Sequence, residues 1–120
     1  MTQTEASAGT FHVNGVGLAW SEQGTGPART PTLVLCHGFT GSSLDFSLQV
    51  DALAADRRVV TLDQRGHGAS TKTGRLADYT IDQLVEDLTA FIETVGGGPV
   101  DLLGHSMGGR VVMGLSLIHI

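Results

Sequence analysis

Three short apolar runs of this chain each lead directly into a loop that contains glycine, and this arrangement limits the possible folds most strongly. The runs cover residues 32–36, 58–62 and 100–103. Continuous apolar runs of this length are typical of strands buried on both faces of a parallel sheet. Glycine makes up 17 of the 120 residues, about twice its average usage of roughly 7%. Because a glycine at a strand end permits a tight turn or a close backbone approach, we expect the strand ends to carry the functional residues.

Helical patterns separate these runs. The clearest covers residues 81–95, where apolar residues recur every three or four positions and would line one face of a helix. Thr80 and Gln83 fit a capping box at its start, and Gly96 is expected to end it. A less regular pattern predicts another helix over residues 44–55.

The remaining segments complete the order of elements. Residues 11–20 are expected to form a hairpin that turns at Asn14-Gly15, a pair that favours a type I′ turn. A last helix should begin near Met107. A hairpin followed by strands that alternate with helices predicts an α/β fold with a mostly parallel sheet, flanking helices and right-handed crossovers. Residues 1–10 are predicted to be a disordered tail.

Charge and composition exclude several classes of protein. A net charge of −5 and a pI near 5.3 disfavour binding to nucleic acid or to an anionic membrane surface. The apolar runs are far shorter than the roughly 20 residues that span a bilayer, and the polar start lacks the apolar core of a secretory signal. The single cysteine, Cys36, excludes internal disulfides and a cysteine-based metal cluster. We expect a cytoplasmic protein that acts on a small molecule without cofactor or metal, and the sequence does not indicate its oligomeric state.

The most informative segment is Gly-His-Ser-Met-Gly-Gly at residues 104–109, directly after the third apolar run. A Gly-x-Ser-x-Gly pattern would arise by chance in about one of seven chains of this composition, so the pattern alone is modest evidence. Here a predicted strand precedes it, a predicted helix follows it, and glycines flank it. These are the conditions for a strained turn that holds the hydroxyl of Ser106 at a helix N-terminus, pointing out of the sheet.

A second loop, at residues 37–41, directly follows the first apolar run. In an acyl-transfer enzyme with a serine elbow, this loop supplies one of the N–H donors that stabilise the oxyanion. Gly38 and Gly41 would let the backbone turn so that the Phe39 N–H faces the reacting carbonyl. The second donor would be the N–H of Met107, one residue past the serine.

A third loop, at residues 63–70, follows the second run, and its Asp63 and Arg65 can lock a tight turn by side-chain hydrogen bonds. His37 and His105 are interpreted as positioning residues beside the oxyanion loop and the elbow, and not as general bases. The acidic residues Asp78, Asp82, Glu86 and Asp87 are interpreted as the solvated face and first turn of a helix. The candidate site comprises Ser106, Phe39 and Met107, with His37, Gly38, Gly104, His105 and Gly108 in supporting positions.

These three loops, in this order and spacing, resemble the N-terminal half of the α/β-hydrolase fold family, from about residue 11 to residue 114. The resemblance implies that Ser106 is the nucleophile and that the N–H groups of Phe39 and Met107 form the oxyanion hole. It further implies hydrolysis of an ester or similar acyl bond through an acyl-enzyme. Family enzymes complete a triad with an acid and then a histidine, both later in the chain than the serine.

The end of the sequence departs from this family pattern. Fourteen residues follow Ser106, none of them is Asp or Glu, and His119 is the one later histidine. Residues 115–120 match the translation of a transposase adapter used to build sequencing libraries. We therefore expect residues 115–120 to be non-native. Residues 11–114 would then be an incomplete domain, without the C-terminal strands, lid, acid and histidine, and inactive by itself.

Several alternative functions remain open. Serine stands at the elbow position where epoxide and haloalkane hydrolases of this fold have aspartate, which disfavours those two activities. Residues 63–66 also resemble proline iminopeptidases, while residues 106–110 resemble carbon–carbon bond hydrolases and the menaquinone-pathway synthase, a lyase. Two alternatives are not enzymes: a non-catalytic, hydrolase-like binding protein and an inert fragment.

Overall fold

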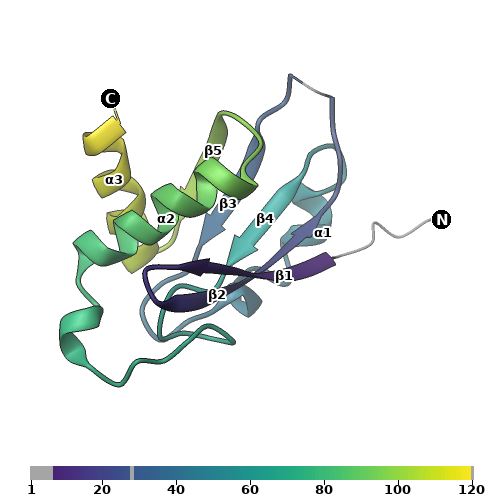
Figure 1. Cartoon of the computed structure of the whole chain (residues 1–120). Helices are drawn as coiled ribbons and strands as arrows, with labels where there is room; N and C mark the ends of the chain where they lie inside the picture. The colour runs from purple at the N-terminus through teal and green to yellow at the C-terminus, as the bar shows by residue number, and fades with distance from the viewer. Residues whose placement is uncertain (1–6, 28, 120) are drawn as a thin grey trace.

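The computed structural model describes residues 7–27 and 29–119, with side chains up to Ser116 in the last helix (Figure 1). The longer helices are α2 and α3, α1 is a short helix, and the 3₁₀ turns η1 and η2 precede α1 and α2. In chain order the elements are β1 (Ser7–Val13), β2 (Val16–Gln23), β3 (Thr32–Cys36), η1 (Ser43–Phe46), α1 (Val50–Leu53), β4 (Val59–Leu62), η2 (Leu76–Asp78), α2 (Ile81–Val95), β5 (Val100–Gly104) and α3 (Met107–His119).

The five strands form one mixed sheet in the order β1-β2-β4-β3-β5. The hairpin β1-β2 is antiparallel and joins β4 in antiparallel orientation, whereas β4, β3 and β5 are parallel. Cys36 at the end of β3 stands opposite Leu62 of β4 on one side and Gly104 of β5 on the other. The loops that follow these three strands therefore meet at one edge of the sheet. The predicted α/β fold is confirmed.

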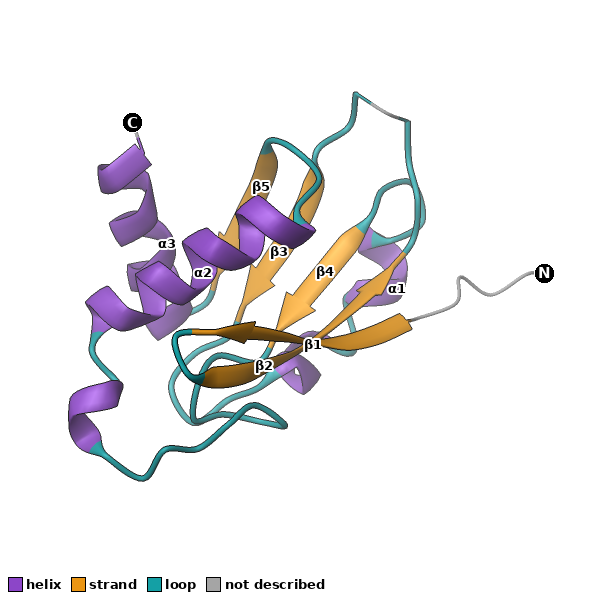
Figure 2. Cartoon of the chain, in the orientation of Figure 1, coloured by secondary structure: helices purple, strands orange, loops and turns teal. Residues whose placement is uncertain are grey.

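Helices cover both faces of this sheet (Figure 2). On one face α2 and α3 pack over a core to which β3 contributes Val34 and Cys36. On the other face η1 and α1 pack against Leu33 and Leu35 of the same strand. Because β3 is buried on both faces, its sequence is continuously apolar rather than alternating. The chain leaves β3 toward β4 on one side and later returns to β5 on its other side, which creates a crevice at the carboxyl end of β3.

The hairpin differs from the sequence prediction at its start. Its turn is type I′ as expected, with φ of 46° at Asn14 and 81° at Gly15. However, β1 begins at Ser7, which pairs with Glu22 of β2. Residues 7–10 therefore belong to the sheet and not to the predicted disordered tail. The rest of that predicted tail, residues 1–6, lies outside the described residues.

Helix α2 has the predicted bounds, but its ends are built differently. The Thr80 hydroxyl accepts a hydrogen bond from the Gln83 N–H at 3.1 Å, whereas the Gln83 amide reaches forward to Asp87 instead of back to the cap. Only half of the predicted capping box is made. Gly96 keeps a helical φ of −66°, and the left-handed residue that ends the helix is Gly97, with φ of 75°.

The predicted helix over residues 44–55 is wrong, because this segment folds into the turn η1 and the four-residue helix α1. Ser42 accepts a hydrogen bond from the Leu44 N–H, and Asp45 accepts one from the Ser42 N–H, which closes η1 as a separate capped turn. Leu44 and Leu48 are 77% and 89% exposed, so the apolar spacing of this segment does not define a buried face.

The outer edge of β5 generates a prediction about association. In the described part of the chain no strand pairs with this edge, and Leu103 on β5 is 42% exposed. An unpaired edge is a template for pairing with another chain. We expect the 120-residue chain to self-associate with rising concentration in size-exclusion chromatography, and Leu103→Lys to shift it toward the monomer. Leu44→Lys, at an exposed leucine away from the edge, should not. A chain that stays monomeric at all concentrations contradicts the prediction.

Candidate active site

The turn between β5 and α3 holds Ser106 in a strained backbone conformation. Only His105 and Ser106 separate the strand from the helix. Ser106 has a φ of 57°, in the left-handed region that residues with a side chain rarely adopt. The N–H groups of Gly108 and Gly109 donate to the carbonyls of His105 and Ser106, each at 2.9 Å. The predicted sharp turn is present, and it leaves Ser106 exposed at the start of α3.

Two glycines let this turn pack against the end of β3. A Cβ atom on Gly108 would overlap the Cys36 carbonyl oxygen and would lie 2.6 Å from the His37 carbonyl oxygen. A Cβ atom on Gly104 would lie 2.5 Å from the backbone nitrogen of Gly109. Neither position accepts a side chain without movement of the backbone, so the glycines that flank the serine have a steric cause.

The loop after β3 lies directly against this turn. A Cβ atom on Gly38 would lie 3.1 Å from the Cβ of Ser106 and 3.2 Å from the His105 carbonyl oxygen. Next along the loop, the Phe39 side chain is exposed, and Thr40 has a left-handed φ of 63°. The fold therefore brings the predicted oxyanion loop and Ser106 together.

Phe39 and Met107, the two predicted oxyanion donors, line the same cavity. Met107 is the first residue of α3, where a backbone N–H has no acceptor within the helix. Among the described residues, the N–H groups of Phe39 and Met107 donate no hydrogen bond. Both groups are thus free to bind an oxygen atom of a ligand.

His37 is fully buried behind this loop, and both of its ring nitrogens are occupied. The Gln64 N–H lies 3.0 Å from Nε2, and the Gly38 carbonyl oxygen lies 2.8 Å from Nδ1. Because a backbone N–H can only donate, Nε2 is the acceptor and Nδ1–H donates to Gly38. Burial lowers the pKa of His37, which favours this neutral form. No nitrogen of His37 is left to accept the proton of Ser106.

The other two histidines near the site have different surroundings. His105 is exposed, and its backbone N–H donates to the Cys36 carbonyl at 3.0 Å, which ties the elbow to β3. The ring of His67 packs between His37 and Phe39, with centroid distances of 4.9 Å and 6.0 Å. His67 contributes to the cavity wall beside Phe39, a role that the sequence did not suggest.

Asp63 and Arg65 fix the loop after β4, as the sequence predicted, although Arg65 does so through a distant partner. The Asp63 carboxylate accepts hydrogen bonds from the backbone of Ser43 (2.7 Å) and Ala69 (3.0 Å). Arg65 forms a bidentate ion pair with Asp87 of α2, at 2.7 Å and 3.0 Å. The hydrogen bonds to Asp87 raise the pKa of Arg65. The prediction that Asp87 lies on a solvated helix face is wrong, because both side chains are 3% exposed.

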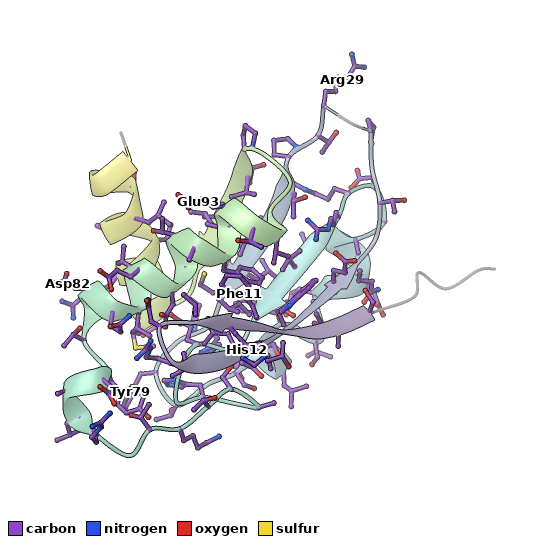
Figure 3. All side chains as sticks on the ribbon, in the orientation of Figure 1. Phe11, His12, Arg29, Tyr79, Asp82 and Glu93 are labelled. Atoms are coloured by element: carbon purple, nitrogen blue, oxygen red, sulfur yellow. The ribbon has the colours of Figure 1, made fainter. Side chains whose placement is uncertain are left out.

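The cavity beside the elbow has a volume of about 490 Å³ and mostly apolar walls. Lys72 lines this cavity, and its Nζ donates to the Gly68 carbonyl oxygen at 2.8 Å. Besides the residues already named, its side-chain walls include Leu76, Tyr79 (labelled in Figure 3) and Leu84. The sequence did not point to these residues, although Leu76 and Tyr79 stand out as large side chains within a polar segment. A hollow of about 520 Å³ around Arg58 contains none of the predicted site residues.

Cys36 is disfavoured as an alternative nucleophile by its burial. Burial raises the pKa of Cys36 to about 12, so its thiol stays protonated and is a poor nucleophile. Across residues 7–27 and 29–119, no group of three or more His, Cys, Asp or Glu residues is arranged to hold a metal ion. Nor does this part of the chain contain a helix long and apolar enough to cross a membrane.

The strand order, the elbow and the adjoining loop together define a hydrolase-type α/β architecture. Residues 31–119 match the α/β hydrolase fold family. The chain therefore belongs to this family.

Two curated relatives and one solved structure illustrate the similarity. The chain is 41% identical over 104 residues to the dihydrolipoyllysine-residue acetyltransferase component of the acetoin cleaving system of Pseudomonas putida, covering 87% of this chain and 27% of the relative. It is 34% identical over 106 residues to bifunctional epoxide hydrolase 2 of Sus scrofa, covering 88% and 18%. The crystal structure of an epoxide hydrolase from Vigna radiata superposes with a TM-score of 0.85 at 33% identity, covering 94% and 34%. The chain thus spans about a fifth to a third of these proteins.

The packing of the elbow predicts different effects for two neighbouring glycines. Gly108→Ala should shift the elbow and lower the free energy of unfolding by several kcal/mol, because the added methyl group collides with backbone and not with a flexible side chain. Gly109→Ala is the matched control, since its Cβ would meet nothing closer than 3.5 Å, and alanine in a helix is favoured over glycine by about 1 kcal/mol. Urea unfolding followed by the fluorescence of Trp20 measures both. Equal stability of the two variants contradicts the proposed packing.

Proposed function

We propose that this chain carries the nucleophile and the oxyanion hole of a serine hydrolase that cleaves an ester or similar acyl bond in a small molecule. The observation that carries the proposal is the placement of Ser106, exposed at a left-handed φ of 57° on a strand-to-helix turn. The unbonded N–H groups of Phe39 and Met107 at one cavity beside that turn support it. A cytoplasmic location and independence from cofactors, metals, nucleic acid and membranes are part of the same proposal.

In the proposed reaction, the Ser106 oxygen attacks the acyl carbonyl carbon and forms a new C–O bond. The carbonyl π electrons move to the oxygen, and this oxyanion accepts hydrogen bonds from the N–H groups of Phe39 and Met107. The serine proton passes to a histidine, which returns it to the leaving group as the C–O or C–N bond breaks. Water then attacks the acyl-enzyme by the same steps, releasing the acid and restoring the serine.

The start of α3 contributes to this chemistry. The helix runs from Met107 to His119, and its N-terminus carries a partial positive charge next to Ser106. That charge favours the alkoxide and the oxyanion over their neutral forms. The histidine and its acid are proposed to follow this chain, as they follow the serine in the family. The longer protein that carries both groups is called the full-length enzyme below.

Serine at the elbow separates this proposal from the activity named for several relatives. A carboxylate nucleophile opens an epoxide to form an ester, and water can then attack the carbonyl carbon of that ester. A serine oxygen would instead form an ether, which has no carbonyl, and the enzyme would stay alkylated. Ser106 therefore favours acyl substrates over epoxides. Peptidase, carbon–carbon hydrolase, lyase and non-catalytic binding functions stay open as alternatives.

Replacement of the serine tests the proposal directly. In the full-length enzyme, Ser106→Ala should abolish labelling by a fluorophosphonate and reduce ester turnover by several orders of magnitude. The melting temperature should stay close to that of the parent, because the backbone conformation is set by the surrounding packing. Ser47→Ala, at an exposed serine away from the elbow, is the control and should label normally. Near-parental turnover by Ser106→Ala would refute the proposed nucleophile.

Two substitutions of Phe39 separate its side chain from its backbone. Phe39→Leu keeps the N–H and should alter substrate preference more than the chemical step. Phe39→Pro deletes the donor, and the loss of one such donor typically lowers turnover about 10²–10³-fold. Circular dichroism must show that the proline variant folds, because proline also constrains Gly38. If the proline variant folds and its turnover is within about threefold of the parent, the oxyanion donor is not the Phe39 N–H but that of a neighbouring residue.

A further inference from the structure

Two consecutive carbonyl groups of the loop after β3, those of His37 and Gly38, each accept a hydrogen bond from a buried side chain. The Gln64 amide nitrogen donates to the His37 carbonyl at 2.9 Å. The Gly38 carbonyl accepts from the His37 ring at 2.8 Å and from the Gly41 N–H at 3.0 Å. His37 and Gln64 are both buried. The peptide groups before and after Gly38 are therefore each anchored through their oxygen atoms.

These anchors determine the direction of the Phe39 N–H. A peptide group is planar and trans, so its N–H points opposite to its C=O. The Phe39 N–H shares a peptide plane with the Gly38 carbonyl, and a fixed carbonyl therefore fixes the N–H. Gly38 itself has no side chain to restrict its φ and ψ. Its conformation is defined only when both neighbouring peptide planes are held.

Gln64 contributes to both anchors. Its backbone N–H donates to Nε2 of His37 and thereby sets the tautomer in which Nδ1–H donates to Gly38. Its side chain holds the His37 carbonyl. We propose that the Gln64 side chain is a positioning residue that orients the Phe39 N–H for the oxyanion. The inference rests on the proposed function, which it deepens by assigning a residue that touches neither substrate nor Ser106.

The charged surroundings of this pair are few and defined. His67, Asp63 and Asp45 are the titratable groups that act on His37. The Asp63 carboxylate is occupied by the N–H groups of Ser43 and Ala69, and Asp45 accepts from the Ser42 N–H. These groups are present in the parent and in every variant at position 64, so a pH effect specific to one variant originates at that position.

Two substitutions with nearly the same shape test the proposal in the full-length enzyme. Gln64→Met removes the donor and should lower kcat at least tenfold with little change in KM, since a misplacement of about 1 Å can cost up to 10²-fold in rate. Gln64→Glu cannot donate while ionised, but its protonated form can donate an O–H to the His37 carbonyl. Its kcat relative to the parent should therefore rise at least tenfold as the pH falls from 8 to 5, whereas the ratio for Gln64→Met should stay flat. Gln49→Met, at an exposed glutamine without a capping hydrogen bond, is the matched control.

Amide hydrogen exchange of Gly41 supplies a second measurement that is independent of turnover. Loss of the anchor should speed this exchange in Gln64→Met and leave it unchanged in Gln49→Met. A kcat of Gln64→Met within about threefold of the parent, identical pH ratios for the two variants, or unchanged exchange at Gly41 would each overturn the proposal. A parent that fluorophosphonate does not label contradicts the proposed function itself, and this inference with it.

Discussion

The contact between the end of β3 and the turn before α3 is the constraint on which the candidate site depends. The Cys36 carbonyl accepts a hydrogen bond from the His105 N–H at 3.0 Å, and the backbone of Gly108 lies so close that no Cβ fits between them. Parallel pairing brings the ends of β3 and β5 to the same level. Because Gly38 and Gly108 have no side chains, the two loops that follow these strands come into direct contact. Ser106 and the Phe39 loop are neighbours because of backbone packing, before any side chain contributes.

Three consecutive residues after β4 stabilise this arrangement from the other side, each in a different direction. Asp63 binds the backbone of Ser43 and Ala69, Gln64 binds His37, and Arg65 binds Asp87. The pair of Arg65 with Asp87 is almost completely buried, so its desolvation offsets much of its attraction. Its main effect is therefore geometric, since it fixes the loop relative to α2, whose N-terminal turns contribute to the cavity wall.

The sequence predicted the features that local patterns determine. Strand positions, the type I′ turn at Asn14-Gly15, the bounds of α2 and the turn at Ser106 all follow from runs, spacings and glycines within a few residues. One error is local, since the helix predicted over residues 44–55 is divided by the capped turn η1. The other errors concern partners that are separated in the chain. Asp87 looked like a solvated acid because its partner Arg65 lies 22 residues earlier, and residues 7–10 looked like a tail because their pairing with β2 is not visible in their composition. The Gln64 anchor of the candidate site was missed for the same reason.

Backbone strain is concentrated where the proposed chemistry takes place. Asn14 is left-handed in a hairpin turn that requires it, but Thr40 and Ser106 are left-handed, with φ of 63° and 57°, in the two loops that contact each other at the cavity. Each such residue costs on the order of 1–3 kcal/mol, and it persists only where the surrounding structure holds it. Around Ser106 the constraint comes from the β3 carbonyl and from α3, which is anchored by the buried Val111. The orientation of the serine is thus determined by packing of the folded chain, so no reorganisation of the backbone is needed when a carbonyl group arrives.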